Sequence, residues 1–246
     1  MKVVICGEFP EKAEENIFHS FPLSWEVHIV PPSGLASELS NADILIPEHV
    51  EINADLLSKA PKLKLVQTGA GYDNVDLKAC TEFGVQACNA AGVNAYAVAE
   101  HVMALILSWY KNIPYLDHFL KDRGEADQLD YTGAELYGKT IGIIGLGHVG
   151  RIVAEYCNAF HMTVLGYSHK LIEMCSVEQV DLDTLFRDSD IISLHVPLTD
   201  STRHLINAET FSKMKPDALL INTSRGGTVD EAALITALEN KDISGA

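Results

Sequence analysis

The sequence predicts an α/β protein whose parallel strands are covered by helices on both faces. Short apolar runs alternate with helix-like stretches along the chain, which is typical of parallel sheets. A turn with the spacing G-x-G-x-x-G lies between a strand pattern and a helix pattern over residues 145–150. A polar, glycine-containing stretch over residues 117–134 is typical of a connector, and we expect it to run between domains.

The composition is that of an ordinary globular protein. The 246 residues suit one large domain or two smaller ones, with 47% hydrophobic and 21% charged residues. A net charge of −16 argues against nucleic acid and anionic membrane as partners. The start of the chain is too short for the apolar part of a signal peptide, and no apolar run reaches membrane-spanning length.

The cysteines indicate a reducing compartment. Their number is odd and none forms a C-x-x-C pair, so we expect them to be small hydrophobic residues in a cytoplasmic protein without a metal site. The cysteines are Cys6, Cys80, Cys88, Cys157 and Cys175.

In the first part of the chain, short apolar runs predict strands over residues 2–6, 25–30, 42–46, 63–67 and 85–87. Helical spacing predicts helices over residues 11–18 and 54–60, with a helical turn over 35–39.

A long helix is predicted next, over residues 95–111, with Asn94 as its N-cap. Its spacing places one apolar stripe toward the core. The residues of this stripe are Val98, Val102, Leu105, Ile106 and Trp109.

After the polar stretch, the alternation resumes. Strands are predicted over residues 140–144, 163–167, 191–196 and 218–222. Helices are predicted over residues 151–160, 182–186, 208–214 and 230–239.

The glycine turn has the properties of a dinucleotide site. Gly145 permits the tight turn out of the strand, Gly147 lets a pyrophosphate approach the backbone, and Gly150 lets helix and strand pack closely. The amide groups at the start of the following helix then face the anion. A glycine turn with a purely structural role is the alternative.

The next strand end bears on the choice of cofactor. A carboxylate that accepts the ribose hydroxyl of NAD is expected about 20 residues after the glycine motif. The sequence there has Ser168, His169 and Lys170 and no carboxylate. A hydroxyl and positive charge suit a 2′-phosphate, which favours NADP over NAD. An ordinary polar loop is the alternative.

Two further strand ends carry candidate site residues. Gly69, Ala70 and Gly71 follow one strand, and glycines two apart allow successive N–H groups to converge on an anion. A flexible turn is the alternative. Arg225 follows another strand, where its planar fork can hold a carboxylate and polarise a carbonyl. A surface arginine before a glycine turn is the alternative.

His195 to Thr199 follow a further strand, and their position suggests that they line the adenine side of a cofactor.

Together these segments resemble the D-isomer-specific 2-hydroxyacid dehydrogenases. They occur in the family's order and cover most of the chain. The matching segments are G-A-G-Y-D-N-V-D from Gly69, Asn94 to His101, Gly145 to Gly150, H-V-P-L-T from His195, and Asn222 to Asp230.

The resemblance implies two doubly wound parallel-sheet domains with a cleft between them. A smaller, flavodoxin-like substrate domain is expected over residues 1–93, and a Rossmann-type cofactor domain over 94–246. Residues 94–134 would form an interdomain helix and connector. A homodimer is also implied, with the helix over 95–109 as a contributor.

The resemblance also implies hydride transfer between NAD or NADP and a small D-2-hydroxy acid or 2-oxo acid. Backbone of Gly69 to Gly71 would bind the substrate carboxylate, and Arg225 would be the catalytic arginine. The residues expected to touch the cofactor are Gly147, His148, Val149, Ser168, Val196, Pro197, Thr202, Thr223, Ser224 and Arg225.

The sequence departs from the family in one respect. The family's proton-transfer histidine and its glutamate partner have no match within the 246 residues, which indicates a C-terminal truncation. We therefore expect little dehydrogenase activity from this chain alone. The alternatives are a non-catalytic NAD(P)-sensing protein, like the family's co-repressor relatives, and oxidation of a substrate that is not an acid.

Overall fold

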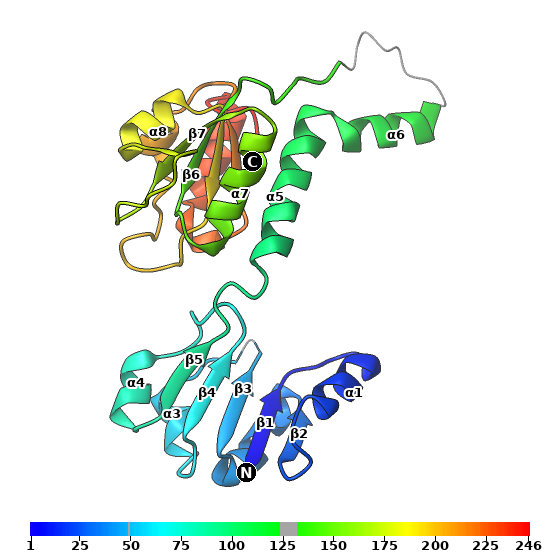
Figure 1. The fold of residues 1–246 in the computed structure, drawn as a ribbon, viewed down its shortest axis with the longest axis vertical. Helices are drawn as coiled ribbons and strands as arrows, with labels where there is room; N and C mark the ends of the chain where they lie inside the picture. Colours follow the sequence, from blue (N-terminus) through cyan, green and yellow to red (C-terminus); the bar gives the residue numbers. More distant parts are fainter. Residues whose placement is uncertain (49, 124–131) are drawn as a thin grey trace. The chain divides into compact units, whose positions relative to one another are not determined.

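The computed structural model describes residues 1–48, 50–123 and 132–246. The chain divides into two compact units, Met1–Val93 and Asn94–Ala246. Each unit has its own parallel sheet and its own hydrophobic core (Figure 1).

The first unit is a five-stranded parallel sheet with the order β2-β1-β3-β4-β5. This is the flavodoxin-like order of doubly wound sheets. Its strands are β1 (Lys2–Cys6), β2 (Glu26–Val30), β3 (Ile44–Pro47), β4 (Leu65–Thr68) and β5 (Gln86–Asn89). Its helices are α1 (Glu11–His19), η1 (Pro32–Gly34), α2 (Leu35–Glu38), η2 (Leu39–Asn41), α3 (Ala54–Ser58) and α4 (Leu77–Glu82).

The core of the first unit lies between the sheet and helices α2 to α4. Val4, Leu45 and Val66 point from neighbouring strands toward the same side, because side chains of a strand alternate between its two faces. They pack with Leu57 of α3 and Ala79 of α4. This packing fixes the carboxyl end of β4, where the loop of Gly69 begins.

The second unit is also a five-stranded parallel sheet, with the order β10-β9-β6-β7-β8. Numbered within the unit, its strands follow the order 3-2-1-4-5 of a dinucleotide-binding sheet. Its strands are β6 (Thr140–Ile144), β7 (Thr163–Tyr167), β8 (Glu178–Gln179), β9 (Ile191–Leu194) and β10 (Leu219–Asn222). Its helices are α5 (Ala95–Tyr110), α6 (Ile113–Arg123), α7 (His148–Ala159), α8 (Leu182–Asp188), α9 (Ala208–Phe211), η3 (Gly226–Thr228) and α10 (Glu231–Asn240).

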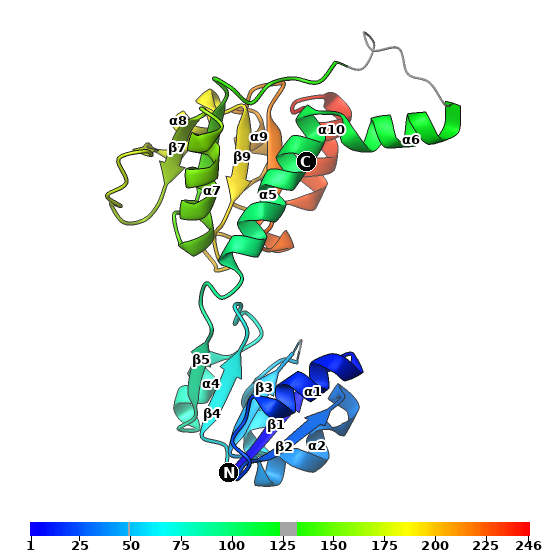
Figure 2. The same cartoon turned by 45° about the vertical axis from the view of Figure 1, so that its right-hand side comes forward.

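The second sheet is covered on both faces. Helices α5 and α7 lie side by side on one face, where Ile106 and Val153 pack against Ile141 (Figure 2). Helices α8, α9 and α10 supply the core of the other face, where Phe186 and Phe211 are almost fully buried. The predicted α/β class with two parallel sheets is therefore confirmed.

Three local predictions were wrong or incomplete. The polar stretch expected to be a connector shares residues 117–123 with helix α6, and its residues 124–131 lie outside the described part of the chain. Helix α4 and the short strand β8 were not predicted. Asn94 is the N-cap of α5 as predicted, although its side chain makes no capping hydrogen bond.

The inward face of α5 also differs from the prediction. Leu105 and Trp109 are 38% and 45% exposed, whereas Ala99, Met103 and Tyr110 are buried. The helix is apolar around most of its circumference, so spacing alone could not choose the face that the sheet covers.

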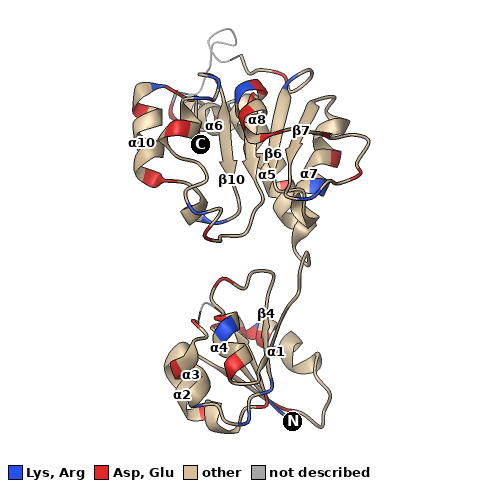
Figure 3. Cartoon of the chain, turned by 90° about the vertical axis from the view of Figure 1, so that its left-hand side faces the viewer, with Lys and Arg blue, Asp and Glu red and all other residues tan. Residues whose placement is uncertain are grey.

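Charged residues lie mainly on the helices and loops of each unit (Figure 3). On α10, for example, Glu231 and Glu239 are exposed. In the described ranges, no helix combines the length and apolarity needed to cross a membrane. The same residues contain no group of three or more His, Cys, Asp or Glu side chains placed to hold a metal ion.

Candidate functional site

The glycine turn lies where the order of the second sheet reverses. Strands β7 and β9 both pair with β6, so the loop after β6 adjoins the loop after β9. Gly145 has φ +101°, which L side chains rarely adopt, and a Cβ there would lie 2.5 Å from the carbonyl oxygen of His195. Ligands of doubly wound sheets bind at this reversal point.

Two glycines of the turn have opposite surroundings. A Cβ on Gly150 would lie 2.0 Å from the carbonyl oxygen of Gly145, so α7 and the turn are in direct backbone contact. A Cβ on Gly147 would meet no heavy atom within 4 Å. The turn is therefore closed on the sheet side and open beside Gly147.

Helix α7 begins at this open position. Gly147 is its N-cap and supplies no side-chain cap, and the N–H groups of the first turn have no acceptor within the helix. The first two of these N–H groups belong to His148 and Val149. A helix start of this kind, beside bare backbone, fits a phosphate group.

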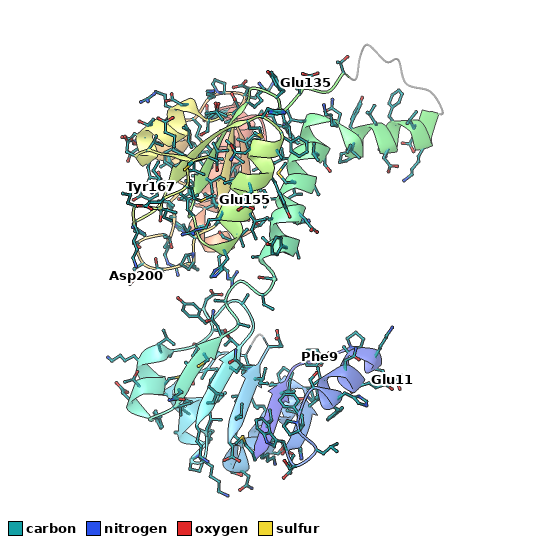
Figure 4. The ribbon with its side chains drawn as sticks, viewed as in Figure 1. Phe9, Glu11, Glu135, Glu155, Tyr167 and Asp200 are labelled. Carbon is teal, nitrogen blue, oxygen red and sulfur yellow. The ribbon has the colours of Figure 1, made fainter. Side chains whose placement is uncertain are left out.

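The loop after β7 holds the residues expected to choose between NAD and NADP. Ser168 is half-buried, while His169 and Lys170 are exposed. The ring of Tyr167 lies edge-on to His169 with 6.1 Å between centroids, and Figure 4 labels Tyr167 at the end of β7. No carboxylate occupies positions 168–170.

Gln179 of β8 holds this loop and was not predicted as a site residue. Its Oε1 accepts a hydrogen bond from the Ile172 N–H at 2.7 Å, and its Nε2 donates to the Lys170 carbonyl at 3.1 Å. No local pattern in the sequence signals this role.

The loop after β9 is organised by a buried hydroxyl. Thr202 Oγ1 donates to the carbonyl oxygen of Pro197 at 2.6 Å and accepts from the N–H of Thr199 at 2.8 Å. Val196 lies against the glycine turn, 3.0 Å from where a Cβ of Gly145 would stand. Asp200 lies in the same loop (Figure 4). Thr202 thus fixes the loop that lines the reversal point.

His195 is partly buried at the end of β9. Its Nε2 lies 2.9 Å from Ser193 Oγ, and burial lowers the pKa of the imidazole from 6.5 to about 4. The ring is therefore neutral at physiological pH and its side chain packs as a hydrogen-bonded polar group.

The lowered pKa of His195 predicts that the stability of the folded protein depends on pH. Between pH 6.5 and pH 4 the unfolded chain binds a proton on His195 and the folded chain does not, so stability falls as the pH falls. We expect a loss of about 1.5 kcal/mol from pH 6.5 to pH 5 that is absent in a His195→Gln variant. Urea unfolding of both proteins at the two pH values measures the difference. If the free energy of unfolding changed equally with pH in the two proteins, the assignment of this pH dependence to His195 would be contradicted.

The end of β10 holds Arg225 by its backbone. Asn222 Nδ2 and Thr228 Oγ1 donate to the Arg225 carbonyl at 3.0 and 2.7 Å. Asn222 Oδ1 also accepts from the N–H and the hydroxyl of Ser224, at 3.0 and 2.7 Å. Thr223 Oγ1 is buried without a hydrogen-bond partner among the described atoms. The backbone of the turn that carries Arg225 is thus held by the side chains of Asn222, before it, and Thr228, after it.

Arg225 itself is half-buried, and its Nη1 donates to the Ser224 carbonyl at 2.9 Å. Thr228 was not predicted as a supporting residue. The polar residue Asn222 at a strand end was the one sequence signal for this arrangement, since Asn side chains often bond to the backbone two residues on.

In the first unit, the loop of Gly69 to Gly71 follows β4. The carbonyl of Gly69 accepts from the Ala90 N–H at 2.9 Å, and the carbonyl of Ala70 accepts from Asn89 Nδ2 at 2.8 Å. A Cβ on Gly69 would meet no heavy atom within 4 Å. The loop is therefore tied to the neighbouring strand β5 and has free space around Gly69.

Comparisons with known proteins found a family model and many similar sequences. The family model described as D-isomer specific 2-hydroxyacid dehydrogenase, NAD binding domain, matches residues 103–246. The chain is 41% identical over 219 residues to a D-3-phosphoglycerate dehydrogenase of Methanocaldococcus jannaschii. The aligned region covers 86% of this chain and 42% of that enzyme. This chain therefore spans less than half the length of that curated relative.

Other relatives match over the whole chain. A glyoxylate reductase of Thermococcus litoralis is 38% identical over 100% of this chain and 78% of its own length. A crystal structure of D-lactate dehydrogenase from Aquifex aeolicus, complexed with NAD and lactic acid, has a TM-score of 0.87 and 32% identity. That match covers 99% of this chain and 75% of the lactate dehydrogenase.

Proposed function

The chain belongs to the D-isomer-specific 2-hydroxyacid dehydrogenase family, and we propose that it is an NAD(P)-dependent oxidoreductase acting on a small D-2-hydroxy acid or 2-oxo acid. The observation that carries this proposal is the turn of Arg225, held at the end of β10 by Asn222 and Thr228. The substrate class rests on the relatives, of which one is named for glyoxylate and another is complexed with lactic acid.

The cofactor would lie against the second unit. The N–H groups of His148 and Val149, beside the open Gly147, would bind its pyrophosphate. Val196 and Pro197 would line the reversal point of the sheet. The bound nicotinamide would supply or accept the hydride.

Two groups would bind the substrate. The amides of the Gly69 to Gly71 loop would hold its carboxylate by charge-assisted hydrogen bonds. Arg225 would donate to the 2-oxygen and stabilise the negative charge that grows there during reduction. This charge stabilisation is why we assign Arg225 the catalytic role.

The proposal is tested by assaying the 246-residue protein with NADH or NADPH and either glyoxylate or hydroxypyruvate. Nucleotide-dependent binding of the 2-oxo acid supports the proposal, and we expect little turnover because the family's proton-transfer histidine and glutamate have no match in these 246 residues. Tight nucleotide binding without any turnover or 2-oxo acid binding would contradict it and would favour a nucleotide-sensing role.

We propose that NADP is the preferred nucleotide. Ser168, His169 and Lys170 offer a hydroxyl and a positive charge, and the loop has no carboxylate to repel a 2′-phosphate. The dissociation constant of NADPH should therefore be lower than that of NADH, both measured by titration calorimetry at one ionic strength. Tighter binding of NADH would reverse the preference.

We also propose that the protein forms a homodimer. It is supported by the exposed apolar side chains of Leu105 and Trp109 on α5 and of Ile113 on α6. An apolar surface of this kind on a soluble protein is a common sign of a protein interface.

A further inference from the structure

We propose that Asn89 is a positioning residue that orients the backbone amides of the Gly69 to Gly71 loop toward the substrate carboxylate. The inference rests on the proposed function, because it concerns the same loop. Asn89 ends β5 and is half-buried beside the loop. It belongs to the neighbouring strand, 19 positions from its partner Ala70.

The side chain of Asn89 makes a hydrogen bond of unambiguous direction. Its partner is the carbonyl oxygen of Ala70 at 2.8 Å, which can only accept. The amide nitrogen of Asn89 must therefore face the loop. The next residue, Ala90, donates its own N–H to the carbonyl of Gly69 at 2.9 Å. Two successive carbonyls of the loop are thus bound by two successive residues at the end of β5.

The planarity of the peptide bond converts these contacts into an orientation of the amides. In a trans peptide, the carbonyl oxygen and the following N–H point in opposite directions, and the described chain has no cis peptide. Because the Gly69 carbonyl points to Ala90, the N–H of Ala70 points away from β5. Because the Ala70 carbonyl points to Asn89, the N–H of Gly71 points away as well.

The result is a pair of adjacent donors on the outer side of the loop. The loop is also uncrowded at Gly69, where an added Cβ would meet no heavy atom within 4 Å. Two successive N–H groups on one side form an anion-binding concavity. A carboxylate presents two acceptor oxygens and suits such a pair.

Asn89 orients the second of these donors, whereas the far end of the loop is fixed by different contacts. Asn74 Nδ2 donates to the Val50 carbonyl at 2.6 Å, and the Ile52 N–H donates to the Asn74 carbonyl at 2.7 Å. These bonds do not involve the peptides of residues 69–71. Asn74 is therefore a matched control: the same residue type, also half-buried, with one side-chain bond to a backbone carbonyl.

The test compares the 246-residue wild-type chain with Asn89→Ala, Asn89→Asp and Asn74→Ala. The Asn89→Asp variant keeps the shape of the side chain but cannot donate when ionised. Two quantities are measured: the ¹⁵N order parameters of the Ala70 and Gly71 amides without ligand, and the dissociation constant of oxamate, an unreactive 2-oxo acid analogue, in the presence of NADH.

We expect order parameters of about 0.85 for the Ala70 and Gly71 amides in the wild type and in Asn74→Ala. In both Asn89 variants, the order parameter of the Gly71 amide should fall below about 0.6. The dissociation constant of oxamate should rise about tenfold in the Asn89 variants, as for the loss of one oriented hydrogen bond. It should stay within about twofold of wild type in Asn74→Ala.

Unchanged order parameters in both Asn89 variants would overturn the proposal, and so would an equal change in Asn74→Ala. Failure of the wild-type protein to bind oxamate would instead contradict the proposed substrate site. In that case the order parameters of the ligand-free proteins still decide whether Asn89 orients the loop.

Discussion

The Gly150→Ala variant is expected to lower the free energy of unfolding of the second unit by about 3 kcal/mol or more. The added Cβ would stand 2.0 Å from the carbonyl oxygen of Gly145. That oxygen belongs to rigid backbone, because the Gly145 N–H donates to the Tyr167 carbonyl at 2.9 Å and Gly145 has φ +101°. Helix α7 would have to move away from β6 to relieve the contact.

The measurement can be confined to the second unit. The chain has two tryptophans, Trp25 in the first unit and Trp109 in the second. In a Trp25→Phe background, urea unfolding followed by tryptophan fluorescence reports on Trp109 and so on the second unit. A wild-type midpoint in the Gly150→Ala variant would show that the turn relaxes and that this glycine is not required.

Gly147→Ala is the matched control. Its Cβ would meet no heavy atom within 4 Å, so we expect stability within about 1 kcal/mol of wild type, the usual range for Gly and Ala at an N-cap. The methyl group would stand where a pyrophosphate approaches the backbone, so the affinity for NADH should fall at least about tenfold. The two variants thus separate folding from nucleotide binding.

Arg225→Lys is expected to lower the small kcat/KM that this chain retains for reduction of glyoxylate about 10²- to 10³-fold, as for the loss of one charge-stabilising donor. Lysine keeps the positive charge but lacks the planar fork that can donate to two oxygens at once. The backbone of residue 225 should stay in place, because Asn222 and Thr228 bind its carbonyl and not its side chain.

The control for this variant is Arg187→Lys, an exposed arginine of α8 whose side chain bonds to Asp188 and Thr184, which should retain wild-type kinetics. The dissociation constant of oxamate is measured in parallel and should rise about tenfold in Arg225→Lys. This second readout does not depend on turnover. Equal affinity and equal kcat/KM in Arg225→Lys and wild type would remove Arg225 from the catalytic site.

The sequence predicted the strands of both sheets well, for a physical reason. Strands such as β6 and β9 are buried on both faces, and such strands are continuous β-branched or aliphatic runs that are easily recognised. The short strand β8 has only Glu178 and Gln179, so no apolar run marks it. Helix α6 has Pro114 in its first turn, where proline is tolerated, but in the sequence a proline there indicates a break in helical structure.

The candidate site was predictable only where a single local segment carries the chemistry. The glycines of the turn and Arg225 stand at strand ends within short motifs. Asn89 and Gln179 act on backbone atoms of other segments, across hydrogen bonds that depend on which strands are neighbours. Such contacts have no signature in the sequence before the strand order is known.

The way Gln179 binds its loop has a consequence for how this scaffold can be altered. Gln179 bonds to main-chain atoms at Ile172 and Lys170, so it constrains the path of the chain and not the identity of the side chains that precede it. We therefore expect that acidic, neutral or basic residues can replace one another at positions 168–170 while the backbone keeps its path. On the proposed function, substitutions at these three positions would alter the choice of coenzyme without disturbing the sheet beneath them.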